Sequence, residues 1–588
     1  MWGRKRSPAL DYKKKNRRKR VRTVAQAAIL VAVGYLVYDS LGYGDKFNEP
    51  DRAKWTSDKG FIAVSYFGVS RSGTPKLIAK SQLEEQLKAL KAQGYVTISQ
   101  QDVIDYYKSG KKLPDKALFL SFEDGRNDSA IFAEPYLQRY NYKATFLSYA
   151  DKMGNGERKF LQPKDMKKMT RTGYWELGSN GYRLSYINVV DSEGNFIGNK
   201  AENELRNKKK IDYYNHYLVD FIRDSDMIPT ENRQEMEARI AYDYDQMNKI
   251  YTDKLGFVPG VYMIMHANAL NEGMNPLVSA ANERNIEKIF QMDFDREGDA
   301  LNTKAGSLYD LTRVQPQAYW YTNHLLMRIR DDTGEPMKFV TGEKDRANDW
   351  TLVNGAAEFR GNRIALTSEA GGTGLLTLKG GESYKDIRLD ASLEGNVVGK
   401  QALYVRYDSE SGSYVRLTLD NNRLILEQKK PGGTTERLFS EELDPVEWED
   451  LDLALNKATT YSKERISSVD LTEETQYPIN VKKTRRVSVS IQGSKLSVRV
   501  NGRAIIEDES IDSSIARGTV AMESEYHKQG DNDDIYDGVF DDVRVKALPE
   551  NGEEGDVLYE NRLNGTEKAL AGAKSAWNST VDWFIKTF

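Results

Sequence analysis

The sequence predicts a multidomain protein with an N-terminal transmembrane helix, a distorted (β/α) barrel and an all-β jelly-roll sandwich. Three observations support this prediction. An uncharged apolar stretch follows a strongly basic N-terminus, short apolar strands alternate with amphipathic helices over 61–331, and apolar and polar residues alternate over 337–548. The 588 residues are enough for two or three domains, each with its own core.

The N-terminus has the composition of a signal anchor. Residues 1–23 hold eleven Lys and Arg against Asp11 alone, and residues 24–38 carry no charge. With its flanks this stretch covers 24–43 and reaches the roughly 17–25 residues that a spanning helix needs. A cleaved secretory signal is the alternative, but no small-x-small cleavage site follows the apolar core. We therefore expect a single-pass anchor with its basic flank in the cytoplasm, a tether at 44–60 and the bulk of the chain outside the cell.

The composition excludes several classes of function. The net charge of −3 argues against nucleic-acid binding by the whole chain, and the basic N-terminus is better explained as the flank of the apolar span than as a nucleic-acid arm. The absence of cysteine excludes disulfides, thiolate metal sites and cysteine catalysis, and in an exported protein it suits a Gram-positive envelope. Four histidines provide little material for a histidine-rich metal site.

The barrel prediction rests on the order of elements after residue 60. A strand at 61–69 precedes a helix at 81–94, whose Leu83, Leu87 and Leu90 share one face. The series continues with a strand at 95–99, a helix at 101–110, strands at 117–120 and 144–149, a charged helix-rich insert at about 200–255, and further strand-like segments before residue 331. This alternation favours a parallel sheet or barrel with functional loops at the strand ends.

An acidic turn follows the strand at 117–120. Glu123 and Asp124 stand at the C-terminal end of this strand, and carboxylates at such a place often carry chemistry in α/β folds. The alternative is a structural role, because an Asp followed by Gly often caps the next helix or shapes the turn. The residues alone leave both explanations open.

Over 61–330 the sequence resembles the polysaccharide deacetylases with NodB homology. The segment "FIAVSYFGVS" is similar to the opening strand of that family, and the run from "LIAKSQ" to "LSFEDG" leads into its first motif. The segment "YWELGSNGYRLSY" resembles the second motif, and "LYDLTRVQP" resembles the late strand with its Arg. The resemblance implies the distorted (β/α) barrel of this family.

The resemblance also implies metal chemistry. Enzymes of the family hold a divalent metal, of the zinc type, with one Asp and two His, and the metal activates water against an N-acetyl group. In their T-F-D-D-G motif the first Asp is the base and the second a ligand, so these positions correspond to Glu123 and Asp124. The two His positions become Asn180 and Leu184, and the histidine that often ends the opening strand becomes Phe67. Leucine cannot bind a metal and an amide is a poor substitute for imidazole, so we expect impaired catalysis and no cofactor.

Other side chains are candidates for this site. His266 stands where the family has a loop near the strand tops, and His324 stands in its late general-acid region, although the spacing around His324 also fits an amphipathic helix. We expect contacts with sugar from the following residues of the barrel: Tyr66, Phe67, Trp175, Asn180, Tyr182 and Trp320.

The C-terminal half resembles the concanavalin-like jelly rolls of the laminin-G or glucanase type. The segments "ALYVRYDSESGSYVRLTL", "KLSVRVNGRAI" and "GVFDDVRV" carry the likeness, which implies glycan binding on a sheet face. The candidates there are Tyr404, Arg406, Tyr414 and Arg416, and ordinary cross-strand pairing is the alternative. Residues 566–588 predict an amphipathic helix that docks on its own protein, on a membrane surface or on a partner.

These expectations combine into one hypothesis. The chain is expected to be a membrane-anchored pseudoenzyme of polysaccharide deacetylase ancestry that binds exopolysaccharide or cell-wall glycan. One alternative is an active N- or O-deacetylase with a rebuilt metal site that uses Asp124, Asn180 and His266. The other is a scaffold that recruits polysaccharide synthase subunits and binds no sugar.

Overall fold

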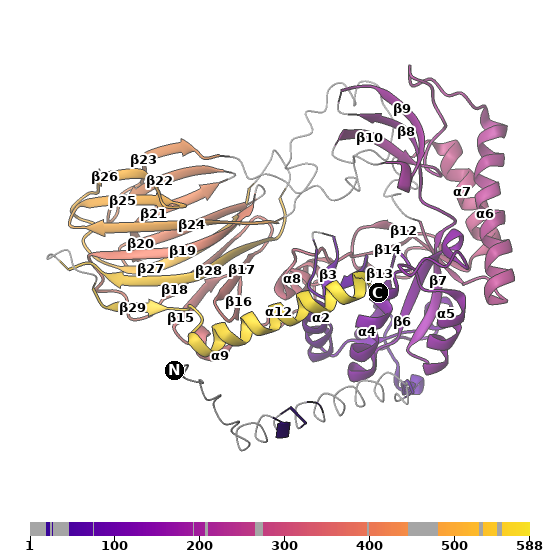
Figure 1. Ribbon diagram of the computed structural model, residues 1–588, viewed down its shortest axis with the longest axis horizontal. Coiled ribbons are helices and arrows are strands. Elements are labelled where there is room, and N and C mark those ends of the chain that lie inside the picture. Colours follow the sequence, from indigo (N-terminus) through magenta and orange to yellow (C-terminus); the bar gives the residue numbers. More distant parts are fainter. Residues whose placement is uncertain are drawn as a thin grey trace, which may run out of the picture.

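The structure is a computed structural model (Figure 1). It describes residues 46–587, except for 75, 192, 206–209, 265–273, 397–398, 421, 445–479, 528–532 and 550–554, together with residues 19, 20, 22, 23 and 26. The predicted anchor at 24–43 lies outside these residues apart from Gln26, and His266 lies outside them as well. In the part of the chain that is described, no helix is both long and apolar enough to cross a membrane. The anchor therefore stays a prediction.

The α/β half is built on one nine-stranded sheet with the order β13-β1-β5-β6-β7-β11-β12-β14 and with β4 beside β5. All neighbours in this sheet are parallel except β13, which runs antiparallel to β1. Val64 and Val314 form a parallel bridge that joins β1 to the chain after β14, so the sheet closes on itself and the predicted barrel is confirmed. The strands are β1 (Phe61–Tyr66), β4 (Val96–Thr97), β5 (Ala117–Phe122), β6 (Ala144–Tyr149), β7 (Trp175–Gly181), β11 (Val261–Met263), β12 (Met292–Glu297), β13 (Leu301–Asn302) and β14 (Leu311–Arg313).

Helices surround this sheet, as Figure 1 shows. Leu83, Leu87 and Leu90 are fully buried, so the apolar face that their spacing predicts is confirmed. The helix after β4 begins at a capping box between Ser99 and Asp102, in which each side chain satisfies a backbone N–H of the first turn. The helices are α2 (Lys80–Ala92), α3 (Gln100–Ser109), α4 (Asn127–Tyr140), α5 (Pro163–Met169), α6 (Arg233–Leu255), α7 (Pro276–Ile289) and α8 (Thr322–Thr333), and a short pair of strands, β2 (Val69–Ser70) and β3 (Ile78–Ala79), lies between β1 and α2.

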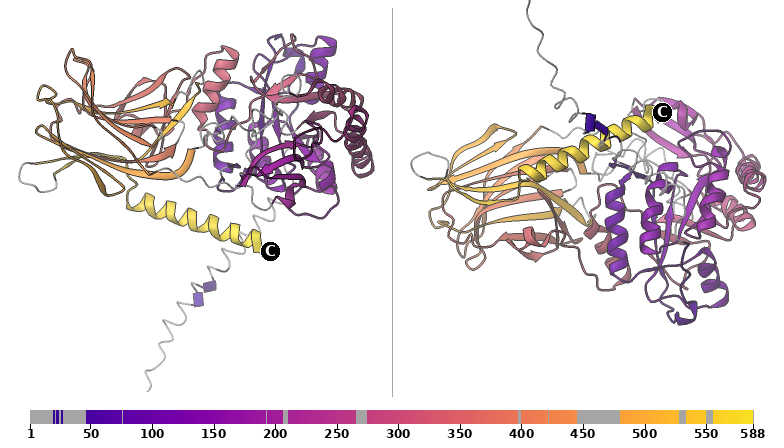
Figure 2. Two further views of the ribbon diagram at one scale, coloured as in Figure 1. Left: turned by 90° about the horizontal axis from the view of Figure 1, so that it is seen from above. Right: turned by 60° about the horizontal axis from the view of Figure 1, so that its bottom comes forward.

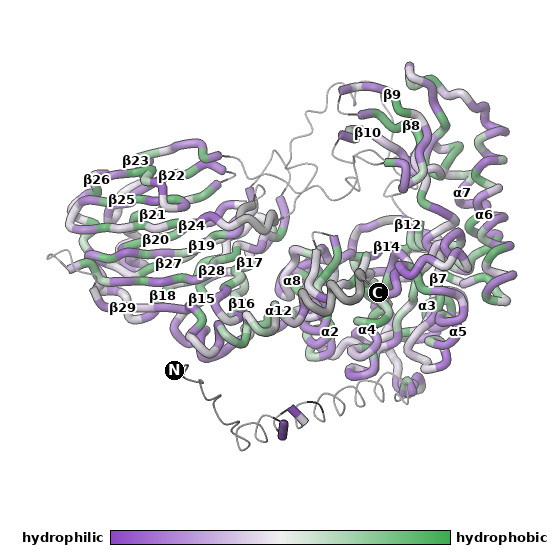
Figure 3. The backbone as a smooth tube through the Cα atoms, in the orientation of Figure 1, coloured by the Kyte–Doolittle hydropathy of each residue, from purple (hydrophilic) through white to green (hydrophobic). Residues whose placement is uncertain are grey.

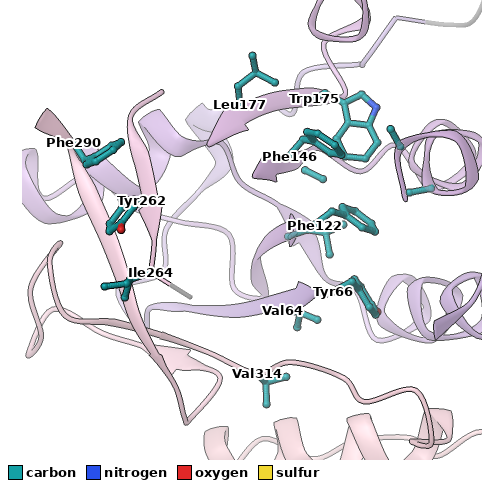
Figure 4. Packing of buried hydrophobic residues seen from close by; sticks show 14 of the residues in the cluster. Val64, Tyr66, Phe122, Phe146, Trp175, Leu177, Tyr262, Ile264, Phe290 and Val314 are labelled. Carbon is teal, nitrogen blue, oxygen red and sulfur yellow. The ribbon is translucent and has the colours of Figure 1, made fainter. Parts of the chain in front are cut away.

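Alternation along each strand separates the interior of the barrel from the helix layer. Val64, Tyr66 and Phe122 pack in the core under the helices (Figure 4), whereas Phe61 and Phe119 belong to a second cluster inside the barrel. Because successive side chains point to opposite faces, the residue that follows Phe122 points into the barrel. The same alternation decides which side chains at the strand ends point into the barrel.

The insert predicted as helical over about 200–255 is helical only in its second half, where α6 begins at Arg233. Its first half contains β10 (Ile211–His216), which joins β8 (Ser185–Asp191) and β9 (Phe196–Ala201) in a three-stranded antiparallel sheet. The aromatic and β-branched residues of β10 favour a strand, but the three lysines at 208–210 just before it obscure this signal in the sequence.

The C-terminal half contains two antiparallel sheets, as the alternating pattern predicts. One has the order β15-β18-β27-β20-β21-β22-β23 and the other β16-β17-β28-β19-β24-β25-β26, with β29 beside β28. Leu403 and Met522 of the first sheet share a core with Val489 and Phe540 of the second, so the sheets pack face to face. The strands are β15 (Trp350–Asn354), β16 (Ala356–Arg360), β17 (Arg363–Ser368), β18 (Thr373–Leu378), β19 (Ile387–Asn396), β20 (Gly399–Asp408), β21 (Ser413–Asp420), β22 (Arg423–Lys429), β23 (Thr435–Glu442), β24 (Asn480–Gln492), β25 (Lys495–Val500), β26 (Arg503–Ser510), β27 (Thr519–Tyr526), β28 (Tyr536–Ala547) and β29 (Val557–Glu560).

The hairpin predicted at Asn501-Gly502 joins β25 to β26, and both turn residues have the positive φ, of 52° and 84°, that this turn requires. The relation of this sandwich to the concanavalin-like jelly rolls stays a prediction.

The barrel and the sandwich are joined through the start of α8. Asp537 of β28 accepts the backbone N–H of Tyr321 at 3.0 Å, and its Oδ2 lies 3.0 Å from His324 Nδ1. His324 also stacks on Trp320, with 4.2 Å between the ring centroids. His324 is therefore a residue of the domain interface, which corrects the alternative in which it serves as a general acid.

After β29 the chain ends in α12 (Gly565–Thr587). This helix lies alongside the molecule rather than within it, as both views in Figure 2 show. Leu570 and Trp577, two members of its predicted apolar stripe, are exposed, so among the described side chains the stripe does not dock on its own protein.

Candidate functional site

The acidic turn stands at the barrel mouth, by which we mean the C-terminal ends of the barrel strands. Glu123 donates its backbone N–H to Tyr66 O at 2.8 Å, which extends the pairing of β5 with β1 by one residue. Asp124 and Gly125 then adopt positive φ values of 63° and 61°. A Cβ at Gly125 would lie 3.2 Å from Ser148 Cα, so the glycine allows the turn to pass close to β6.

The helix that follows does not use the acidic turn as a cap. α4 has Arg126 at its N-cap position, and no side chain makes the capping hydrogen bond. The explanation of Asp124 as a helix cap is therefore wrong. Its Oδ2 instead accepts a hydrogen bond of 3.4 Å from Arg126 Nη1, with which it forms an ion pair.

Glu123 is held by an arginine from the opposite end of the barrel sequence. Its Oε1 accepts a hydrogen bond from Arg313 Nε at 2.9 Å, and the two side chains are 0% and 5% exposed. Arg313 ends β14, which lies beside β1 once the sheet closes. Glu123 Oε2 and Arg313 Nη1 are both buried, and within the described ranges neither has a hydrogen-bond partner. The pair thus presents one free acceptor and one free donor inside the barrel.

Asp124 is fixed through Asn180 of β7. The Asp124 N–H donates to Asn180 Oδ1 at 2.9 Å, and Asn180 Nδ2 donates to Met263 O at 3.1 Å. One amide therefore ties the acidic turn to the end of β11. Burial raises the pKa of the Asp124 carboxyl from 3.8 to about 6, although the positive charges of Lys159 and Arg126 oppose this shift.

Tyr149, the last residue of β6, completes the site. Its parity matches that of Leu147, which lies in the interior cluster, so its ring points into the barrel. Its hydroxyl is buried and has no hydrogen-bond partner in the part of the chain that is described. Burial together with the nearby Asp124 and Glu123 raises its pKa well above the ordinary value. Tyr149 thus adds a third unpartnered polar group to those of Glu123 and Arg313, and such a set fits a small polar ligand group or ordered water.

The residues present do not fit the metal site that the resemblance implies. Asp124 keeps a carboxylate, but the Asn180 amide is bound to two backbone groups, and Leu184 offers no donor atom. Over the described ranges, no group of three His, Cys, Asp or Glu side chains is placed to hold a metal ion. No step that needs a metal can be derived from these side chains.

Several residues expected to contact sugar belong to the core instead. Tyr66 is buried under the helices, where its hydroxyl donates to Gln86 Oε1 at 3.0 Å, and Trp175 packs against Phe122 and Phe146 in the same layer (Figure 4). These two assignments are wrong because both faces of a parallel strand are apolar and buried, so the sequence does not show which face is the interior.

The other predicted barrel residues lie nearer to the surface. Phe67 and Tyr182 are half-buried and follow β1 and β7 directly, Trp320 is half-buried against His324, and Asn180 lies at the site itself. The residues that were not foreseen are Tyr149 and Arg313. Both had a signal in the sequence: the resemblance includes the late strand that contains Arg313, and Tyr149 is the last residue of the strand predicted at 144–149.

Three of the four candidates in the sandwich share one sheet face. The Tyr404 and Tyr414 rings lie 5.2 Å apart, and the Arg416 guanidinium lies over both. Arg416 also donates to Glu427, and Tyr404 donates to Glu523 at 2.7 Å, so much of the hydrogen bonding is internal to the face. Glycan binding here stays a prediction.

Arg406 does not belong to that face. It has a φ of +51° at an irregularity in β20 and donates to three backbone carbonyls, those of Lys385, Gly493 and Ile515. Its assignment to a glycan site is wrong, because the irregularity breaks the alternation on which the prediction relied.

The pKa of Asp124 leads to a prediction about stability. Because the folded-state pKa of about 6 lies above the ordinary 3.8, the cost of burying this carboxylate is absent below pH 3.8, accumulates as the pH rises from 3.8 to 6 and is complete above pH 6. We expect Asp124→Asn to raise the free energy of unfolding by up to about 3 kcal/mol at pH 7.5 and to change it little at pH 3.5. Urea unfolding at the two pH values measures this difference.

The control is Asp105→Asn, in which a hydrogen bond from Lys111 lowers the pKa of the native carboxyl. This variant should be slightly less stable at pH 7.5, the opposite direction. A gain in stability for Asp124→Asn that is the same at both pH values would show that burial of the charge is not the cause.

Comparisons with known proteins agree with the fold and the motifs. Residues 110–254 match the family "Polysaccharide deacetylase". A poly-beta-1,6-N-acetyl-D-glucosamine N-deacetylase of Staphylococcus aureus (strain MSSA476) is 26% identical over 192 residues, which are 32% of this chain and 59% of the relative. The Escherichia coli (strain K12) enzyme of the same name is 22% identical over 260 residues, 40% of this chain and 38% of the relative.

A solved structure of a de-N-acetylase from Aggregatibacter actinomycetemcomitans aligns with a TM-score of 0.34 and 19% identity, over 44% of this chain and 95% of that chain. This chain spans about three fifths of the length of the staphylococcal relative. Residues 110–254 are a polysaccharide deacetylase domain, homologous to poly-beta-1,6-N-acetyl-D-glucosamine N-deacetylases.

Proposed function

We propose that this protein binds exopolysaccharide or cell-wall glycan at the barrel mouth and is catalytically impaired as a deacetylase. One observation carries the proposal. Of the three expected metal-ligand positions, Asp124 alone keeps a carboxylate, and that carboxylate pairs with Arg126 at 3.4 Å, while the Asn180 amide holds two backbone groups and Leu184 has no donor. The named substrate of the curated relatives, poly-beta-1,6-N-acetyl-D-glucosamine, suggests the class of glycan.

The mode of binding follows from burial at the site. Glu123, Asp124 and Tyr149 are buried, so a sugar ring cannot lie directly against them. The glycan is expected to lie across half-buried aromatic residues such as Phe67 and Tyr182 and to insert a small polar substituent. A hydroxyl or acetamido group can donate and accept hydrogen bonds, which matches the free Glu123 oxygen, the free Arg313 nitrogen and the Tyr149 hydroxyl.

The same proposal includes a place in the cell. The basic segment 1–23 and the apolar segment 24–43 support a single-pass anchor with the N-terminus in the cytoplasm and the glycan-binding body outside. In that position the protein would meet polysaccharide as it leaves the membrane, next to polysaccharide synthase subunits. Alkaline carbonate extraction of membranes tests the anchor, because an integral protein stays in the pellet.

Tyr149→Phe tests the proposed site. We expect it to weaken the binding of the full chain to β-1,6-linked N-acetylglucosamine oligomers by about 3–10-fold, the value of one hydrogen bond. The free energy of unfolding should not fall, because the deleted hydroxyl has no hydrogen-bond partner among the described residues. Isothermal titration and urea unfolding measure the two quantities.

Tyr66→Phe is the matched control. The Tyr66 hydroxyl donates a hydrogen bond to Gln86 on the face of the sheet that the helices cover. This variant should therefore lose about 0.5–1.5 kcal/mol of stability and keep its affinity for the oligomers. The reverse pattern would place the glycan elsewhere. If the wild-type chain binds no oligomer, the scaffold alternative is favoured over the proposal.

A further inference from the structure

Exposed apolar side chains gather where the sandwich ends. The described residues include exposed large apolar side chains on two strands there: Leu352 and Val353 of β15, and Val557 and Leu558 of β29. The two strands are joined by a hydrogen bond of 2.8 Å from Trp350 to Tyr559. α12 departs from the same end of the sandwich, as Figure 3 shows, and it carries the two most exposed large apolar side chains.

Those two side chains belong to one stripe of α12. Leu570 and Trp577 are 72% and 67% exposed, and with the exposed Ala573 they fall within about 60° of one another around the helix axis. The sequence continues the same spacing with Val581, Phe584 and Phe588. Exposed apolar side chains on one side of a helix, here Leu570 and Trp577, mark an interaction surface.

We propose that α12 lies in the plane of a lipid bilayer, with this stripe buried among the acyl chains and its polar face toward water. Within the described chain no helix is apolar enough to cross a membrane, so α12 would rest on the surface rather than span it. Its charged residues are Glu567, Lys568, Lys574, Asp582 and Lys586, three cations against two anions, a small excess of positive charge that suits anionic lipid.

A bilayer is preferred to a protein partner because of the position of the barrel's first residues. Phe47 is fixed to the barrel, since its N–H donates to Thr172 O at 2.9 Å and its ring packs on Tyr174. Only a few residues separate Phe47 from the end of the apolar segment 24–43, a reach of about 15 Å at most. If that segment spans the membrane, as the proposed function holds, the body is confined close to the lipid surface, and α12 is the exposed amphipathic element available to meet it.

The absence of cysteine from the chain makes a direct test possible. Ala573→Cys lies on the stripe and Ala571→Cys on the opposite side, and both positions are exposed alanines of the same helix. Each variant of the full chain is labelled with the fluorophore NBD and reconstituted in vesicles of phosphatidylglycerol and phosphatidylcholine. We expect doxyl-labelled lipid to quench NBD at 573 about twofold or more and to leave NBD at 571 nearly unchanged, since an interfacial helix buries only its apolar face.

Three results would overturn the proposal. They are equal quenching at both positions, no quenching at either, or a blue-shifted emission at 573 that doxyl lipid does not affect, as a second copy or another protein would produce. Trp577→Glu should reduce quenching at 573 to the level at 571 without changing oligomer affinity. Carbonate extraction reports the anchor separately, so a failure of the anchor and a failure of α12 to meet lipid are distinguishable.

Discussion

Arg313→Ala lowers the free energy of unfolding by about 3–5 kcal/mol, because it leaves the Glu123 carboxylate buried without its charged partner. Both side chains lie inside the barrel, and no solvent reaches the carboxylate to replace the lost ion pair. Urea unfolding of the variant at pH 7.5 measures this loss. It is the largest change that we expect from a single substitution at the barrel mouth.

Two further variants separate the buried charge from the loss of packing. Arg313→Met combined with Glu123→Leu removes both charges and should recover most of the lost stability, since an apolar pair often replaces a buried ion pair at little cost. Arg233→Ala removes an exposed helical pair with Glu237 and should cost less than about 1 kcal/mol. If Arg313→Ala and the double variant lower the free energy of unfolding equally, the burial of an unpaired charge is not the cause of the lost stability.

Asp537→Ala is expected to lower the free energy of unfolding by about 2–4 kcal/mol, because several buried groups lose their acceptor together. Besides the Tyr321 N–H and His324, the carboxylate accepts a hydrogen bond of 2.6 Å from Thr367 Oγ1. Tyr321 and His324 belong to the barrel half and Thr367 to the sandwich. The variant should therefore unfold the two halves less cooperatively, which differential scanning calorimetry detects as a broadened or divided transition.

The control for this interface is Lys430→Ala, which removes an exposed ion pair with Asp512 within the sandwich and should leave the calorimetric transition unchanged. Asp537→Asn keeps one acceptor oxygen and should fall between the wild type and the alanine variant. A single sharp transition for Asp537→Ala, shifted no further than that of Lys430→Ala, would show that this carboxylate does not join the two halves.

The barrel and the two-sheet region could be predicted because their signals are local. The alternation of strands and helices marks the barrel, and the period of two with Asn501-Gly502 marks the sandwich. The small sheet of β8, β9 and β10 was not predicted. Charged residues surround β9 and β10, whereas β8 is as long as the barrel strands and mostly apolar, so its signal was available but was overlooked.

The candidate site was predictable only in part, for two physical reasons. Glu123 and Asp124 stand at a strand end that the sequence marks, but their partners come from distant elements, and 190 residues separate Glu123 from Arg313. The direction of a side chain in a strand buried on both faces cannot be read from hydrophobicity. Tyr66 and Tyr149 each end a strand, yet Tyr66 lies under the helices, and the alternation of β6 from the interior Leu147 turns Tyr149 into the barrel.

The central claim is that this deacetylase domain handles glycan without metal-dependent hydrolysis. The most direct test is to measure the metal content of the purified full chain and the acetate that it releases from poly-beta-1,6-N-acetyl-D-glucosamine, beside Asp124→Ala. We predict no stoichiometric metal, no acetate above that of the variant, and retained binding of the glycan. Stoichiometric divalent metal that is lost in Asp124→Ala, together with acetate release by the wild type alone, would contradict this account and establish an enzyme with a rebuilt site.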